Sequence, residues 1–195
     1  MSAVTVERRT KETEVNLSLE IGRAPGVIST GLPFFDHMLT AAAFHGRLGL
    51  AVEATGDIDV DPHHLVEDVG IVLGSALTKW VDASGPIARF GHAIIPMDDS
   101  LAEITIDVSG RSYLVYRGEL PQQYCGTLDV ILFREFFTGL ALTSRANVHV
   151  EYRYGINSHH LVEAAFKAFG RAAHQAYTPL GKGAQGPLST KGSLD

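Results

Sequence analysis

The sequence has little of three things that decide a protein's class: cysteine, long apolar stretches and an excess of one charge. Its 195 residues contain one cysteine, Cys125, which excludes an intrachain disulfide, a thiolate zinc site, an iron–sulfur cluster and CxxC redox chemistry. The longest apolar stretch, residues 69–77, is interrupted by two glycines and a serine and is far shorter than the roughly 18 residues of a membrane-spanning helix. Any metal ion is therefore expected to bind histidines and carboxylates.

The charge balance excludes further classes. Sixteen Lys and Arg against 22 Asp and Glu give a net charge of −6, whereas nucleic-acid binding needs clustered basic residues. The first residues turn polar within a few positions and lack the apolar core of a secretory signal. We therefore expect a cytoplasmic globular protein that binds neither nucleic acid nor membrane.

The nine histidines are the most informative residues, because four of them form two adjacent pairs. Each pair opens the same five residues, HHLVE, at 63–67 and again at 159–163, which is an offset of nearly half the chain. A match of this kind predicts an internal duplication.

The hydrophobic patterns around the two pairs support the duplication. Alternating runs at 14–21, 101–108 and 112–116 predict strands, and helix-like stretches follow at 34–43 and 132–142. Strand-like stretches at 48–54 and 147–154 come next, then helical patterns at 65–81 and 161–176. We predict an α+β protein of two halves, 1–83 and 84–178, each built as strands, helix, strand, helix. The tail, 179–195, shows no periodicity and is disordered or ordered by a ligand or a neighbour.

The HHxxE pattern has a definite geometry on a helix. The first histidine and the glutamate are four residues apart on one face and can share an ion, whereas the second histidine points about 100° away. Two sites that exchange their lone histidines between chains would use all of these residues: His63 with Glu67, His159 with Glu163, and the lone His64 and His160. Imidazole and carboxylate donors without sulfur suit Mn²⁺, Fe²⁺, Zn²⁺ or Ni²⁺, and the hard carboxylates favour Mn²⁺.

The HH pairs and the nearby aspartates also have simpler interpretations. A single HH pair is more often two polar residues at a helix start, but its repetition with the same glutamate argues for a metal site. Asp57, Asp61 and Asp68 lie nearby in the sequence, either as partners that orient the imidazoles or as helix-start and loop acids. For Asp57 we favour the loop.

Seven short motifs, in order along the chain, resemble the imidazoleglycerol-phosphate dehydratase family. They are TKET at 10–13, GLPFFDHML at 31–39, DPHHLVED at 61–68, RFG at 89–91, SGR at 109–111, NSHHLVEAAFKAF at 157–169 and STKG at 189–192. The resemblance implies a sandwich of sheet and helix layers, duplicated in two halves, in a hollow assembly of 24 subunits with two Mn²⁺ per active site at subunit interfaces. The implied metal ligands are His37, His63, His64, Glu67, Glu135, His159, His160 and Glu163.

One ligand position departs from the family pattern. Many members have a histidine 24 residues before the second HH pair, where this chain has Glu135. A carboxylate can still bind Mn²⁺, so we expect an altered site and not a lost one. His149 is the alternative ligand, although we expect a strand histidine packed in the core.

The reaction implied by the resemblance is the loss of water from D-erythro-imidazoleglycerol phosphate, which gives imidazole-acetol phosphate. The proton that leaves is not next to a carbonyl, so the imidazole ring must accept the electrons, as an imidazolate that passes to a diazafulvene-like intermediate. The resemblance makes Glu12, Glu67 and Glu163 the catalytic carboxylates, and we take Glu163 and Glu12 as candidate bases. Glu12 also belongs to the implied substrate site.

The phosphate group of the substrate needs fixed cationic and hydroxyl donors. The resemblance implies Arg89, Arg111, Lys167, Ser189, Thr190 and Lys191, whose chemistry is suitable. Each of the three cations before the tail could also be an ordinary surface charge.

Two other functions remain open from the sequence. A non-catalytic metal store would need no converging cations. A metal-dependent phosphate-ester hydrolase would need a DxD motif near a strand end, and Asp57-Ile58-Asp59 has these letters but lies in the loop before the first HH pair.

Overall fold

The structure, a computed structural model, describes residues 2–181 and contains two sheets of equivalent topology. In the first half, the sheet order is β1-β2-β4-β3. Its elements are β1 (Val4–Arg9), β2 (Thr13–Leu19), β3 (Ile28–Ser29), α1 (Pro33–Gly46), β4 (Ala51–Gly56) and α2 (His63–Ser84). β2 pairs antiparallel with β1 and β4, and β3 pairs parallel with β4.

The second half repeats this order. Its elements are β5 (Phe90–Met97), β6 (Ser100–Asp107), β7 (Tyr113–Arg117), α3 (Leu132–Ser144), β10 (Asn147–Tyr154) and α4 (Ser158–Tyr177), with a short hairpin of β8 (Tyr124–Cys125) and β9 (Leu128–Asp129) before α3. The sheet order is β5-β6-β10-β7, again with one parallel pair, β7 and β10. The predicted α+β fold of two duplicated sheet/helix halves is confirmed; the exact limits of the halves stay a prediction.

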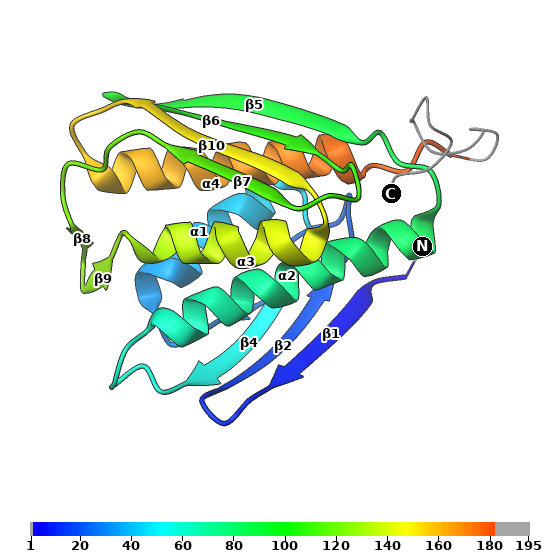
Figure 1. The fold of residues 1–195 in the computed structure, drawn as a ribbon, viewed down its shortest axis with the longest axis horizontal. Coiled ribbons are helices and arrows are strands. Elements are labelled where there is room, and N and C mark those ends of the chain that lie inside the picture. The colour runs from blue at the N-terminus through cyan, green and yellow to red at the C-terminus, as the bar shows by residue number, and fades with distance from the viewer. Residues whose placement is uncertain (1, 182–195) are drawn as a thin grey trace.

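The helices lie between the two sheets (Figure 1), and the buried apolar residues of the inner strands belong to the core that the helices share. Alternation explains this arrangement, because Val15, Leu17 and Leu19 of β2 are buried while the residues between them are half-buried. The helices pack across the halves: α1 lies against α4, and α2 lies against α3. The two halves therefore share one core, in which Phe35 contacts Phe136, and Phe133 contacts Phe166, edge to face.

Glycines set the register of the two helix crossings. A Cβ at Gly170 of α4 would lie 2.0 Å from the carbonyl oxygen of Ala42 in α1. A Cβ at Gly74 of α2 would lie 2.4 Å from the carbonyl oxygen of Leu140 in α3. The backbones can approach this closely only without a side chain. Ala42 and Leu140 are 98 residues apart.

The helix ends give the same offset. α1 ends at Arg47 with φ 49 and α3 ends at Arg145 with φ 52, both in the left-handed region. Because Arg47 and Arg145 are also 98 residues apart, the two helices are equivalent residue by residue. His37 of α1 and Glu135 of α3 therefore hold equivalent positions.

None of the helices in the described part of the chain is long and apolar enough to cross a membrane.

Candidate metal centre

Two imidazoles and a carboxylate meet where α1 crosses the start of α4. His37 Nε2 and His159 Nε2 each lie 3.2 Å from Glu163 Oε2. Ligand atoms of the three residues all lie within 4.8 Å of one another. The start of α4 is fixed by Asn157, whose side chain accepts a hydrogen bond from the backbone N–H of His159 at 3.0 Å. Nitrogen and oxygen donors in this spacing suit one divalent cation.

Glu163 is the buried member of this group, with 7% of its surface exposed. Burial raises its pKa, but Lys167, whose Nζ lies 2.8 Å from Oε1, and His37 outweigh burial, so the pKa of Glu163 lies below its ordinary value. Both carboxylate oxygens are thus engaged, one by the imidazoles and one by Lys167. Because its pKa is lowered, Glu163 carries the negative charge that a carboxylate metal ligand needs.

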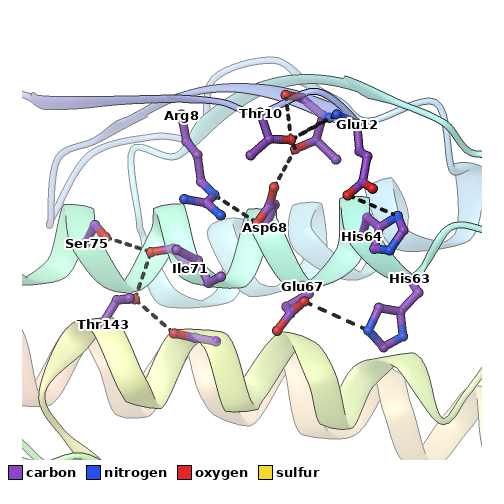
Figure 2. Close-up of polar contacts among 12 residues, drawn as sticks. Arg8, Thr10, Glu12, His63, His64, Glu67, Asp68, Ile71, Ser75 and Thr143 are labelled. Atoms are coloured by element: carbon purple, nitrogen blue, oxygen red, sulfur yellow. Dashed lines mark hydrogen bonds and ion pairs between the residues drawn. The ribbon is translucent and has the colours of Figure 1, made fainter.

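The corresponding residues of the first half lie at the start of α2. His63 Nε2 is 3.9 Å from Glu67 Oε2 (Figure 2). Asp61 accepts a hydrogen bond from the backbone N–H of His63 at 2.8 Å. Glu135 is half-buried in the first turn of α3, at the position equivalent to His37. Within residues 2–181 the compact three-donor group is His37 with His159 and Glu163, so ligation by Glu135 stays a prediction.

The lone histidine of the first half, His64, faces two carboxylates. Its Nδ1 lies 3.4 Å from Asp57 Oδ2. It also lies 3.6 Å from Glu12 Oε2 (Figure 2). The hydrogen bond to Asp57 and the charge of Glu12 raise the pKa of His64. Asp57 does lie in a loop, as predicted, but it contacts an imidazole from there.

The lone histidine of the second half, His160, faces the turn between β5 and β6. Its Nδ1 lies 2.7 Å from Asp99 Oδ1, and its Nε2 lies 3.8 Å from Asp98 Oδ2. His160 and the backbone N–H of Ile156 hold the pKa of Asp99 well below its usual range. The sequence analysis missed this acid pair, although it stands at the turn before a predicted strand, as Glu12 does.

A polar network holds the turn that carries Glu12 (Figure 2). Asp68 of α2 is buried and accepts hydrogen bonds from Arg8 Nε, at 2.8 Å, and from Thr13 Oγ1. Thr10 Oγ1 accepts the backbone N–H groups of Glu12 and Thr13 at 3.1 and 3.0 Å. Asp68 therefore anchors the β1–β2 turn and contacts no imidazole, whereas Asp61 is a helix-start acid.

The cations predicted to bind phosphate are not gathered in one chain. Arg89 forms a two-pronged pair with Asp107, at 2.7 and 3.2 Å, and its backbone N–H donates to Ala176 near the end of α4. That point is roughly 25 Å along α4 from His159, at about 1.5 Å per residue. Arg111 is exposed beyond β6, and Lys167 pairs with Glu163. Ser189, Thr190 and Lys191 lie outside the described residues.

His149 was expected to pack in the core, and this expectation was wrong. Its side chain is exposed on the face of β10 opposite Val148 and Val150, which are buried against the helices. The carboxylates expected to be catalytic divide between the clusters: Glu163 lies with His37, Glu67 with His63, and Glu12 with His64.

Comparison with known proteins identifies relatives over nearly the whole chain. Residues 30–173 match the family model described as imidazoleglycerol-phosphate dehydratase. The imidazoleglycerol-phosphate dehydratase of Geobacter sulfurreducens is 52% identical and that of Limosilactobacillus fermentum 46% identical, with 97% and 100% of each chain covered. Solved structures from Staphylococcus aureus, covering 91% of this chain, and from Pyrococcus furiosus in complex with (S)-C348, covering 96%, each show 38% identity, a TM-score of 0.82 and 99% coverage of the solved chain.

Proposed function

The chain belongs to the imidazoleglycerol-phosphate dehydratase family, and from this membership we propose how its residues carry out the reaction. It is a hydro-lyase of histidine biosynthesis, so the storage and hydrolase alternatives no longer stand. We propose that it converts D-erythro-imidazoleglycerol phosphate into imidazole-acetol phosphate with two Mn²⁺ per active site. A cytoplasmic location remains part of the proposal.

The donor group at the α1–α4 crossing is the observation that supports metal binding most directly. His37, His159 and Glu163 offer two imidazole nitrogens and a carboxylate within 4.8 Å, on two packed helices. The three-donor group in the described chain includes no thiol: Cys125 borders the same cavity as His159 but is buried, and burial raises the pKa of its thiol. Such a set favours Mn²⁺ or a neighbouring divalent cation.

The second donor set follows from the duplication. His63 and Glu67 correspond to His159 and Glu163, and Glu135 corresponds to His37 by the register of the helix crossings. Each set therefore combines donors from both halves, and two histidines, His64 and His160, are left outside both sets. We propose that each lone histidine completes a set in a neighbouring copy, which makes self-association a condition of activity and fits the expected assembly of 24 subunits.

The ions would act as Lewis acids that polarise the substrate's imidazole ring and diol oxygens. Glu12 is the carboxylate best placed to take the proton from the carbon chain of the substrate. Its side chain is 55% exposed and its nearest ionic partner, His64 Nδ1, is 3.6 Å away, whereas both oxygens of Glu163 are engaged. We propose that Glu67 and Glu163 hold the ions.

The phosphate site would also form between copies. In one chain Arg89 lies near the far end of α4 from His159, while Lys167 is one helical turn from Glu163. A neighbour that presents its arginines at this surface would bring the cations together around a phosphate group.

Metal content tests the donor assignment. Chelator-stripped protein loaded with Mn²⁺ is expected to hold two ions per chain by elemental analysis, and His159→Ala is expected to lose one ion and turnover. His92→Ala is the matched control, because His92 is an exposed strand histidine whose Nε2 contacts Glu103 at 3.1 Å. A His159→Ala variant with two ions and unchanged turnover would contradict the assignment.

A further inference from the structure

The turns that carry Glu12 and Asp99 are equivalent in the duplicated fold. In each half a glycine, the last residue of β4 or the residue after β10, packs against the first residue of an inner strand and a leucine of the next helix. Gly56 packs against Thr13 and Leu65, and Gly155 packs against Ser100 and Leu161. Glu12 and Asp99 directly precede Thr13 and Ser100. Each of the two carboxylates faces Nδ1 of the lone histidine in its own half.

The two carboxylates differ in how firmly they are held. Asp99 Oδ1 lies 2.7 Å from His160 Nδ1, and Asp99 Oδ2 accepts the backbone N–H of Ile156 at 2.7 Å and the Ser100 hydroxyl at 3.0 Å. The carboxylate of Glu12 has one ion-pair contact, between Oε2 and His64 Nδ1 at 3.6 Å. Asp99 is fixed in place, whereas the carboxylate of Glu12 can move.

The contact with Asp99 decides which nitrogen of His160 carries the proton. A carboxylate accepts hydrogen bonds and cannot donate them, so at 2.7 Å the proton of a neutral imidazole belongs on Nδ1. The lone pair is then on Nε2, which can bind a metal ion. Asp98 does not compete, because its Oδ2 is 3.8 Å from Nε2, beyond hydrogen-bond distance, and its side chain is 79% exposed.

We propose that Asp99 is a positioning residue that holds His160 in its Nδ1-protonated form, so that Nε2 is presented to the metal-binding set of a neighbouring copy. This inference rests on the proposed function, in which His160 completes the set of His63, Glu67 and Glu135 in that copy. Duplication thus produced one fixed carboxylate and one mobile carboxylate from equivalent turns. The mobile carboxylate, that of Glu12, can therefore act on the substrate as the proposed base.

Two substitutions at Asp99 distinguish tautomer control from simple support of the turn. In Asp99→Asn, the amide oxygen is expected to keep the bonds from Ile156 and Ser100, which turns the NH₂ group toward His160 Nδ1. Because that NH₂ group donates, the imidazole proton must move to Nε2, where it blocks metal binding. Asp99→Ala removes the constraint and leaves His160 free to adopt either form.

The experiment is a Mn²⁺ titration of full-length, chelator-stripped protein against a competing fluorescent chelator, with the mass of the assembly followed by light scattering. One of the two affinities is expected to fall about 10-fold in Asp99→Ala and about 100-fold in Asp99→Asn, with Mn²⁺-dependent assembly weakened in the same order. Asp98→Asn, the matched control in the same turn, is expected to match the parent protein.

The opposite order would overturn the inference, because Asn preserves the turn's hydrogen bonds and Ala does not. Equal affinities in the parent and both Asp99 variants, with two ions bound, would also overturn it while leaving the proposed function standing. If the parent binds fewer than two ions per chain, the proposed function fails and the inference fails with it. If Asp99→Ala does not fold, the Mn²⁺ affinities of Asp99→Asn and Asp98→Asn are compared with each other to test the inference.

Discussion

At the scale of single residues, the carboxylates differ by how many partners each already has. Glu163 is buried between two imidazoles and Lys167, which suits a fixed metal ligand. Glu12 stands on a turn with an exposed carboxylate beside His64. A general base must reach the substrate and keep a free oxygen, and among these candidates that description fits Glu12.

Replacement of Glu12 by glutamine is therefore expected to lower kcat on the order of 10²- to 10⁴-fold, because the amide cannot accept the proton. The bound Mn²⁺ is expected to stay at two ions per chain. Glu14→Gln is the control, since Glu14 is a partly exposed acid two residues later, on β2, and faces Arg9 at 3.6 Å. Steady-state kinetics with elemental analysis checks both variants, and full turnover in Glu12→Gln would remove it from the mechanism.

At the scale of elements, the β1–β2 turn is the part whose position depends on a buried charge. Asp68 joins α2 to this turn through Arg8 and Thr13 (Figure 2). At the equivalent position of α4, 96 residues later, the chain has Ala164, which is also buried. The fold therefore accepts alanine at this point of the helix, and the buried carboxylate serves the placement of the turn.

The Asp68→Ala variant is expected to fold, to lose about 1–3 kcal/mol of unfolding free energy because Arg8 and Thr13 lose their acceptor, and to lose kcat with its metal content unchanged. Ser75→Ala is the control on the same helix, because its hydroxyl bonds only the Ile71 carbonyl within α2, at 2.8 Å. Denaturant unfolding and kinetics measure the two effects. Unchanged kcat in a destabilised Asp68→Ala protein would reduce Asp68 to a structural role.

The elements that the sequence predicted are those with strong periodicity. The four helices and the inner strands β2, β6 and β10 were expected within a few residues, because their buried faces produce clear patterns. β1 and β5 were missed. Both are edge strands: only Val6 of β1 is buried, and β5 contains Gly91 and Pro96, which weaken a strand pattern.

The site was predictable to the extent that its residues repeat. The HH pairs and their glutamates could be predicted because the same five residues occur twice, which indicates an internal duplication of a functional motif. The contact of Asp99 with His160 joins residues 61 positions apart and belongs to no motif, so only the packing of a turn against α4 reveals it. The pairing of Lys167 with Glu163 is a four-residue spacing that sequence could have suggested.

At the scale of the whole molecule, the duplication produces two donor sets and two histidines that neither set uses. The helices lie between the two sheets (Figure 1). The four paired histidines, in the first turns of α2 and α4, are half-buried. Of the predicted phosphate cations in the described chain, Lys167 contacts the His37 cluster through Glu163, whereas Arg89 lies near the far end of α4. Metal binding, self-association and activity are therefore expected to depend on one another.

The most direct test is product formation from imidazoleglycerol phosphate by chelator-stripped protein, with and without added Mn²⁺, while free phosphate is assayed in parallel. The account predicts negligible turnover without metal, turnover restored by Mn²⁺, and no release of phosphate. Full turnover by protein shown to be free of metal, or none after two ions per chain have rebound, would contradict it.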